Sequence, residues 1–263
     1  MSVLERILAA KRADLAREQE ALPMRRLIEL AKGAPPPRDF AGALRRPSDG
    51  LHVIAEIKRA SPSRGGIRQG ADVGAIARAY EAAGAAAVSV LTEQHFFLGS
   101  PEDLTAAKES IGLPVLRKDF VFDEYQVYQS RLMGADAVLL IARVLERRDL
   151  ERLVGVTRSL HMEALVEIHE TEEIARAAAA GAAIVGVNNR DLATLAVSID
   201  TSLRLAAALP AGMIRVSESG IESHADLERL RQAGYQAALV GERLMRETDP
   251  GAALRALRGE GGA

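Results

Sequence analysis

Short apolar runs alternate with longer helical patterns along most of this 263-residue chain. Eight runs are rich in β-branched or apolar residues and have the length of strands, at 52–58, 87–91, 115–118, 137–141, 164–167, 184–187, 214–217 and 237–240. The segments that follow them have the apolar spacing of helices, at 73–83, 101–110, 123–133, 147–160, 171–180, 201–208, 223–232 and 250–257. This alternation predicts a parallel sheet with crossover helices.

Glycine stops divide this alternation into repeated units. Gly84, Gly134, Gly181 and Gly234 each end a predicted helix and lead directly into the next strand. Glycine commonly ends helices because it adopts the left-handed conformation without steric cost. Eight evenly spaced units favour a closed (β/α)8 TIM barrel over an open doubly wound sheet, which rarely needs eight.

Residues 1–46 lie outside the repeat. They predict two amphipathic helices, at 3–20 and 24–31, followed by a proline-rich breaker at 34–37. We expect one domain over residues 1–263, with this segment as a helical extension. The pattern leaves two roles open for it: a plug under the bottom of the barrel, or a lid over the catalytic face.

Composition narrows the classes of function. The 34 Lys and Arg nearly balance the 36 Asp and Glu, so we expect neither nucleic acid nor an anionic membrane as a partner. The absence of cysteine excludes disulfides and cysteine nucleophiles. The five histidines lack metal-ligand or triad spacing, so we expect no metal and no cofactor. Charges interrupt the apolar pattern of the first residues and no long apolar stretch follows, which predicts a cytoplasmic protein without a membrane span.

Charged side chains follow the predicted strands, where barrel enzymes carry their active sites. Glu56 and Lys58 end the first strand and point to the same side, and the third and fifth strands end in Lys118 and Glu167. Four charges of both signs therefore converge. They indicate either an active site or a structural ion-pair network.

The loops after the seventh and eighth strands carry Ser219-Gly220 and Gly241-Glu242. In barrels these loops commonly bind phosphate, because glycine lets oxygens approach backbone N–H groups at a helix start. We therefore expect a phosphorylated substrate, with the Glu242 side chain turned away. Phe96, Phe97 and Phe120 lie near the same rim and form either core or a wall for an aromatic ring.

Eight motifs, in order along nearly the whole chain, resemble the strand-end motifs of the indole-3-glycerol-phosphate synthase family. They are AEIKRASPSRG, VSVLTEQHFFLGS, LPVLRKDFVFDEYQ, GADAVLLIA, ALVEIH, GVNNRDL, VSESGI and LVGERLM. That family closes and decarboxylates an anthranilate-derived ribulose phosphate in tryptophan biosynthesis, without a metal or redox cofactor. The resemblance also favours the lid role, because the family's helical extension covers the substrate.

The resemblance implies roles for individual residues. Lys118 is the expected general acid and Glu167 its acid/base partner, while Glu56 and Lys58 orient the substrate and transfer later protons. Asn188, Arg190 and Ser219 are expected to hold sugar hydroxyls, the carboxylate and the site geometry. The expected phosphate cradle is Ser61, Gly220, Gly241 and Glu242. Phe97, Phe120 and Pro62 are expected near the aromatic ring, and Glu218 and Leu239 complete the substrate-binding set.

Two other functions fit the same residues. A Schiff-base aldolase would use Lys118 as an amine that attacks a carbonyl. A non-catalytic phosphosugar-binding barrel, or a subunit that docks a pathway partner, would not need four mutually opposed charges. Contact with neighbouring pathway enzymes stays open.

Overall fold

The structure is a computed structural model that describes residues 2–62, 65–68, 70–191 and 196–260. Eight parallel strands close into a barrel in the order β1, β10, β9, β8, β7, β6, β5, β4 and back to β1. The strands are β1 His52–Ile57, β4 Ala87–Leu91, β5 Val115–Lys118, β6 Ala137–Ile141, β7 Glu163–Ile168, β8 Ile184–Asn188, β9 Ile214–Glu218 and β10 Ala237–Val240. The predicted (β/α)8 barrel is confirmed.

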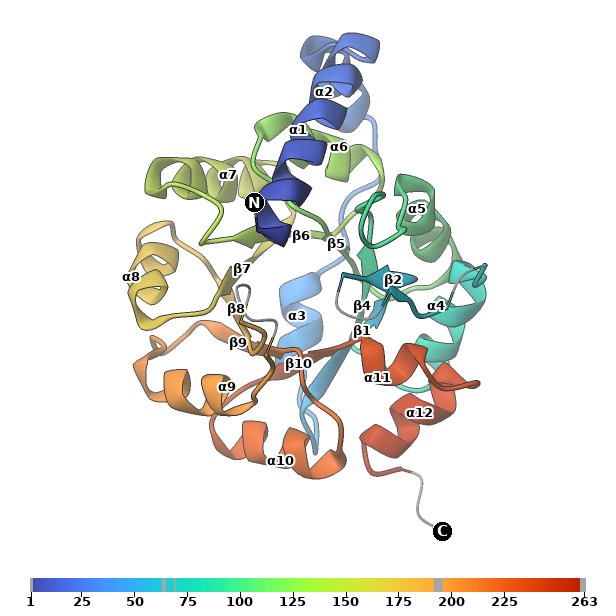
Figure 1. The fold of residues 1–263 in the computed structure, drawn as a ribbon, viewed down its shortest axis with the longest axis vertical. Helices are drawn as coiled ribbons and strands as arrows, with labels where there is room; N and C mark the ends of the chain where they lie inside the picture. Colours follow the sequence, from blue (N-terminus) through green and yellow to red (C-terminus); the bar gives the residue numbers. More distant parts are fainter. Residues whose placement is uncertain (1, 63–64, 69, 192–195, 261–263) are drawn as a thin grey trace.

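Helices surround the barrel as an outer ring (Figure 1). They are α4 Val73–Ala82, α5 Pro101–Ser110, α6 Glu124–Leu132, α7 Arg147–Ser159, α8 Thr171–Ala179, α9 Asp200–Leu205, α10 His224–Gln232, α11 Glu242–Met245 and α12 Pro250–Leu257, with the 3-10 helix η1 Ala206–Ala208 after α9. The sequence pattern did not predict α11, or the small antiparallel sheet of β2 Ala60–Ser61 and β3 Gly65–Gly66. Over the described ranges, no helix is both long and apolar enough to span a bilayer.

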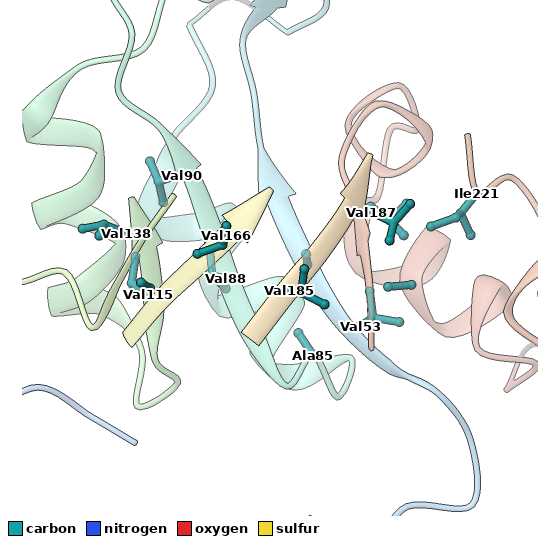
Figure 2. Packing of buried hydrophobic residues seen from close by; sticks show 14 of the residues in the cluster. Val53, Ala85, Val88, Val90, Val115, Val138, Val166, Val185, Val187 and Ile221 are labelled. Atoms are coloured by element: carbon teal, nitrogen blue, oxygen red, sulfur yellow. The ribbon is translucent and has the colours of Figure 1, made fainter. Parts of the chain in front are cut away.

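The period-two alternation of the strands builds two apolar clusters. Val115 and Val138 pack between strands and outer helices, whereas the next residues, Leu116 and Leu139, pack inside the barrel. Figure 2 shows the outer cluster, in which valines of neighbouring strands stack side by side. The strands therefore bury both faces, which explains their near-continuous apolar sequences.

The N-terminal segment contains three helices, α1 Val3–Ala21, α2 Met24–Lys32 and α3 Phe40–Arg45. The pattern did not predict α3. Phe40 and Leu44 of this helix are buried in the interior cluster beside Ile54 and Ala87, near the start of the strands. In Figure 1, α3 lies within the ring of strands. A short part of the segment thus fills the bottom of the barrel.

Helices α1 and α2 contact other parts of the barrel. The Tyr125 hydroxyl on α6 donates to the carbonyls of Glu18 (2.8 Å) and Leu22 (2.9 Å) at the end of α1. Lys11 Nζ on α1 lies 3.0 Å from Asp119 Oδ2, which directly follows β5. These contacts hold α1 beside the loops at the C-terminal ends of the strands. The extension therefore has one part at each end of the barrel.

Candidate active site

A cavity of about 640 Å³ opens where the strands end. Residues of all eight barrel strands and of the loops that follow them line it. The predicted site residues on its wall are Glu56, Lys58, Phe97, Lys118, Phe120, Glu167, Asn188, Arg190, Glu218, Ser219, Gly220, Leu239, Gly241 and Glu242. Residues predicted from distant segments therefore share one cavity.

The Lys118 ammonium lies between two buried carboxylates. Its Nζ is 3.2 Å from Glu167 Oε2 and also contacts Glu218 Oε2. The side chains of both glutamates are at most 3% exposed. Glu218 reaches this position because β8 carries Gly186 beside it: a Cβ there would lie 2.0 Å from Glu218 Oε1.

Burial and charge act in opposite directions on the pKa values of these groups. Burial lowers the pKa of Lys118, but Glu218, Glu167 and Glu56 together raise it well above its ordinary value. Burial raises the pKa of Glu167, and the more strongly acting neighbours, above all Lys118, lower it below its ordinary value. Burial raises the pKa of Glu218 to about 7, because Glu167 adds to the rise that Lys118 opposes. Lys118 is thus held as an ammonium, and the two carboxylates differ in acidity.

A second ion pair stands on β1 and just beyond it. Lys58 Nζ lies 2.7 Å from Glu56 Oε1, and both side chains are largely buried. Gly241 adjoins this pair, since a Cβ on Gly241 would lie 2.4 Å from Glu56 Oε1. A side chain at Gly241 would therefore displace Glu56, whatever else that glycine does.

Asn188 connects several polar groups at the end of β8. Its Oδ1 accepts from Ser219 Oγ at 2.9 Å and from the Arg190 N–H at 3.0 Å. Burial raises the pKa of Glu167, and the charges of Lys118 and His169 lower it. A hydrogen bond from the Asn188 side chain adds to this lowering. Ser219 has a φ of 69°, a conformation unusual for a residue other than glycine.

Comparison with known proteins shows the family of the chain. The model of the family "Indole-3-glycerol phosphate synthase" matches residues 4–257. The chain belongs to the indole-3-glycerol phosphate synthase family. Curated relatives with that name share 46% identity in Carboxydothermus hydrogenoformans (97% of this chain, 98% of the relative) and 49% in Mycolicibacterium vanbaalenii (96% and 92%). The relative in Micrococcus luteus shares 48% over 98% of this chain and 97% of its own length.

Solved structures of other proteins support the fold alone. A mandelate oxidase Y128F structure superposes with a TM-score of 0.60 at 20% identity, covering 94% of this chain and 92% of that chain. A thiamine phosphate pyrophosphorylase from Pyrococcus furiosus superposes with a TM-score of 0.59 at 16% identity, covering 80% and 95%. At these identities the likeness extends to the barrel and no further.

The aromatic wall depends on a residue that the sequence reasoning missed. The Phe97 and Phe120 rings lie 6.2 Å apart at 42° and both line the cavity. The buried carboxylate of Glu93 accepts from the N–H groups of His95 (3.0 Å), Phe96 (2.7 Å) and Phe97 (3.0 Å). Glu93 therefore shapes the loop that presents Phe97. The motif TEQHFF contains Glu93, but the sequence does not predict that three backbone N–H groups donate to its carboxylate.

Asp119, next to Lys118, is a second residue that the sequence reasoning missed. Its Oδ2 accepts from Thr92 Oγ1 at 2.6 Å and contacts Arg117 at 2.9 Å and Lys11 at 3.0 Å. Burial raises the pKa of Asp119, but Arg117 and Lys11 outweigh it and hold this pKa at about 2. This buried carboxylate fastens α1 to the rim of the site.

The two predicted phosphate loops differ from each other. Gly241 is the N-cap of α11, as expected for a glycine at a helix start. Gly220 has a φ of 74°, but α10 begins only at His224 with Ser223 as its N-cap. The Glu242 side chain contacts Arg246 and lies 3.6 Å from Arg190 on the cavity wall. The expectation that it turns away from the phosphate stays a prediction.

Two predicted residues lie apart from the cavity wall. Ser61 is buried in β2, and Pro62 is exposed immediately after it. The next two positions, 63–64, lie outside the described residues. The contribution of Ser61 and Pro62 to binding stays a prediction. In the part of the chain that the structure describes, no group of three or more His, Asp or Glu side chains is arranged to hold a metal ion.

Proposed function

We propose that the chain converts 1-(2-carboxyphenylamino)-1-deoxyribulose 5-phosphate to indole-3-glycerol phosphate, CO₂ and water by general acid/base catalysis. The observation that carries this proposal is the Lys118 ammonium between Glu167 and Glu218 on a cavity with an aromatic wall. The reaction needs a proton donor at a carbonyl oxygen and a base near an arylamine. The cavity wall offers both.

Lys118 acts first, as the general acid. A ring carbon of the anthranilate moiety attacks the ribulose carbonyl carbon, the C=O π electrons move to oxygen, and Lys118 gives that oxygen a proton. The neighbouring carboxylates support this role because they favour the ammonium over the free amine. An imine-forming lysine needs surroundings that favour the free amine. The two carboxylates therefore argue against a Schiff-base aldolase.

Glutamates and Lys58 share the later proton transfers. Loss of CO₂ from the ring carbon that made the attack leaves the electrons of the broken C–C bond in the ring. Dehydration then requires removal of the arylamine proton and protonation of the departing hydroxyl, which leaves as water. The methylene carbon beside the nitrogen then loses one proton and the nitrogen regains one, which gives the indole ring. Glu167, with its lowered pKa, is the base in this assignment, while Lys58 beside Glu56 donates the proton. Glu218, with its raised pKa, restores the proton of Lys118.

The remaining predicted site residues bind the substrate in this proposal. Asn188, Ser219 and Arg190 hold the sugar hydroxyls and the carboxylate. Phe97, Phe120, Leu239 and Pro62 surround the aromatic ring. Ser61, Gly220, Gly241 and the backbone of Glu242 hold the phosphate, with N–H groups at the start of α11 contributing.

Helix α1 serves as a lid over the catalytic face, and α3 belongs to the barrel core of the same single domain. Besides the Lys11–Asp119 pair, Asp14 Oδ2 lies 2.8 Å from His95 Nε2, and the Arg6 guanidinium lies 5.5 Å from the centre of the Phe96 ring. These contacts join α1 to the loop that carries Phe97. A closed α1 would exclude water from the reacting groups.

Turnover of the carboxyphenylamino-deoxyribulose phosphate, followed by indole fluorescence, tests the reaction directly. We expect turnover by the unaltered chain without added metal or cofactor. Folded protein that forms no product would contradict the assignment. Borohydride added during turnover, followed by intact mass analysis, should leave Lys118 unmodified, and a substrate adduct on Lys118 would install the Schiff-base mechanism instead.

Inorganic phosphate tests the anion cradle separately. We expect it to compete with substrate, and Gly220→Ala to weaken that competition more than it lowers kcat. Gly241→Val should raise KM strongly, but it should also lower kcat because its Cβ meets Glu56. An unchanged KM in both variants would contradict the phosphate cradle.

The cytoplasmic location stays a prediction, which cell fractionation would test.

A further inference from the structure

His169 is a buried ring directly after β7, two residues beyond Glu167. Its side chain is only 4% exposed. Among the described residues, neither Nδ1 nor Nε2 has a hydrogen-bond partner. Buried polar atoms without partners are rare in folded proteins and call for an explanation. The catalytic roles proposed above do not use this ring.

The ring lies between two carboxylates. Nε2 is 3.5 Å from Glu167 Oε1, and Nδ1 is 3.9 Å from Glu173 Oε2. The other oxygen of Glu167, Oε2, is the one that contacts Lys118. Glu167 is therefore held between a lysine on one oxygen and a histidine on the other.

The Glu173 carboxylate has a fixed position beside the His169 ring. Its Oε2 accepts from the N–H groups of His169 (2.6 Å) and Glu170 (3.2 Å) at the start of α8. Its Oε1 lies 3.7 Å from Arg143 Nε. A carboxylate fixed by backbone donors moves little, so the ring beside it has a defined position. Glu173 thus supports His169, and His169 faces Glu167.

The chemistry of the ring suits this place. A neutral imidazole has one N–H donor and one lone pair, whereas the protonated ring has two donors. Between two carboxylates, a neutral ring would turn its lone pair toward one of them. A lone pair that faces a carboxylate is repelled by its negative charge. A proton on each ring nitrogen removes this repulsion.

We propose that His169 is a positioning residue that holds Glu167 Oε1, so that Oε2 stays on Lys118, and that the ring's positive charge keeps Glu167 ionised. This role rests on the proposed function, since Glu167 is the base there. The charged groups that face the pair are Lys118 on β5, Glu218 on β9, Glu173 on α8, and Glu170 and Arg143 in the flanking loops. The pKa of Glu167 agrees with the geometry: burial raises it, and Lys118 and then His169 lower it.

Two substitutions test the role in turnover. His169→Phe keeps a ring without donors, and His169→Asn restores one donor. We expect kcat to fall about tenfold in His169→Phe, below the roughly 10²-fold that misplacement of a catalytic group can cost, and to recover in part in His169→Asn. KM should change much less. Exposed His161, before β7, gives the matched control His161→Asn, which should leave kcat unchanged.

The pH profile separates this role from simple packing. Loss of the positive ring should raise the pKa of Glu167, so the acidic limb of kcat/KM should move to higher pH by about one unit in both variants. A limb that stays in place, with turnover intact, would overturn the role. So would equal losses in His169→Phe and His169→Asn.

A measurement without turnover keeps the role testable if the proposed reaction fails or if a His169 variant does not fold. The ring ¹⁵N chemical shifts of His169 report how many of its nitrogens carry protons. Near pH 6, the doubly protonated fraction should be lower in Glu167→Gln than in the unaltered chain, and Glu56→Gln should leave it unchanged. Equal fractions in all three proteins would show that the ring does not sense Glu167.

Discussion

The two ends of this barrel are built from the same strands and have opposite chemistry. At the N-terminal end, Phe40 and Leu44 of α3 fill the interior with apolar atoms. At the C-terminal end, Lys118 and two glutamates replace them. On β5 the change takes two residues, because Leu116 and Lys118 point to the same side. Apolar burial at the bottom offsets the desolvation cost of the charges at the mouth.

The largest effect on stability should come from the bottom. Phe40→Ala removes a fully buried ring, so we expect the free energy of unfolding to fall by about 3–5 kcal/mol in denaturant titrations. The kcat/KM of the folded protein should change by less than about threefold, because the cavity lies at the other end. Phe97→Ala, at the mouth, should show the reverse pattern. Similar losses of activity in both variants would mean that the two ends are not independent.

A matched pair of lysines sharpens the comparison. Lys118→Ala should lower kcat on the order of 10²-fold or more, with a smaller change in KM, because a positioned acid is lost. Lys118→Arg should rescue little, since guanidinium is a poor proton donor. Lys108 lies 2.7 Å from Asp136 Oδ2 near the bottom. Lys108→Ala should lower the free energy of unfolding and leave kcat unchanged. A loss of kcat as large as in Lys118→Ala would refute the separation of stability and catalysis between the two ends of the barrel.

The sequence predicted the strands well because each is a short, largely buried run between helices with clear periods. Charged strand ends also predicted that Lys118, Glu56 and Glu167 converge, and all three line one cavity. Helix α3 was missed because six residues are too few to establish a helical period, and its burial depends on strands far along the chain.

Other parts of the site depend on contacts that no sequence pattern carries. Glu93 accepts from backbone N–H groups of its own loop, and His169 lies between two nearby carboxylates. Asp119 pairs with Lys11 of a distant segment. The contact between Glu218 and Lys118 requires the missing side chain of Gly186, so it depends on the strand register. Residue type and strand position could place these groups near the mouth, but could not assign their partners.

The extension joins the two ends, so the position of a truncation matters. Deleting residues 1–33 removes α1 and α2 but keeps α3. We expect kcat/KM to fall on the order of tenfold, because the lid is lost, with a cooperative unfolding transition retained. Deleting residues 1–46 removes Phe40 as well and should also destabilise the barrel. Full kcat/KM after the shorter deletion would make α1 a structural appendage.

Glu218 gives the mouth a stability that depends on pH. Its pKa is about 7 in the folded chain against an ordinary 4.5, because burial disfavours the charged form. Its contribution is therefore fully present below 4.5 and is lost as pH rises through about 7. The Tm of the unaltered chain minus that of Glu218→Gln should fall by several degrees from about pH 5 to about pH 8. A Tm difference that does not change with pH would show that Glu218 is not the group that holds this proton.

The smallest effect should come from backbone strain at the mouth. Leu98 follows Phe97 with a φ of 54° and is exposed, so it adopts the left-handed conformation without packing to offset the cost. That conformation costs a bulky residue about 1–2 kcal/mol, and asparagine tolerates it better. Leu98→Asn should therefore raise the Tm by about 2–4 °C. His161, before β7 at the other end, has a φ of 60°, but histidine already tolerates this region, so His161→Asn should raise the Tm less. Since the backbone need not move, Leu98→Asn should keep kcat/KM. A stabilised variant with impaired turnover would instead mean that the strain at Leu98 helps to present Phe97.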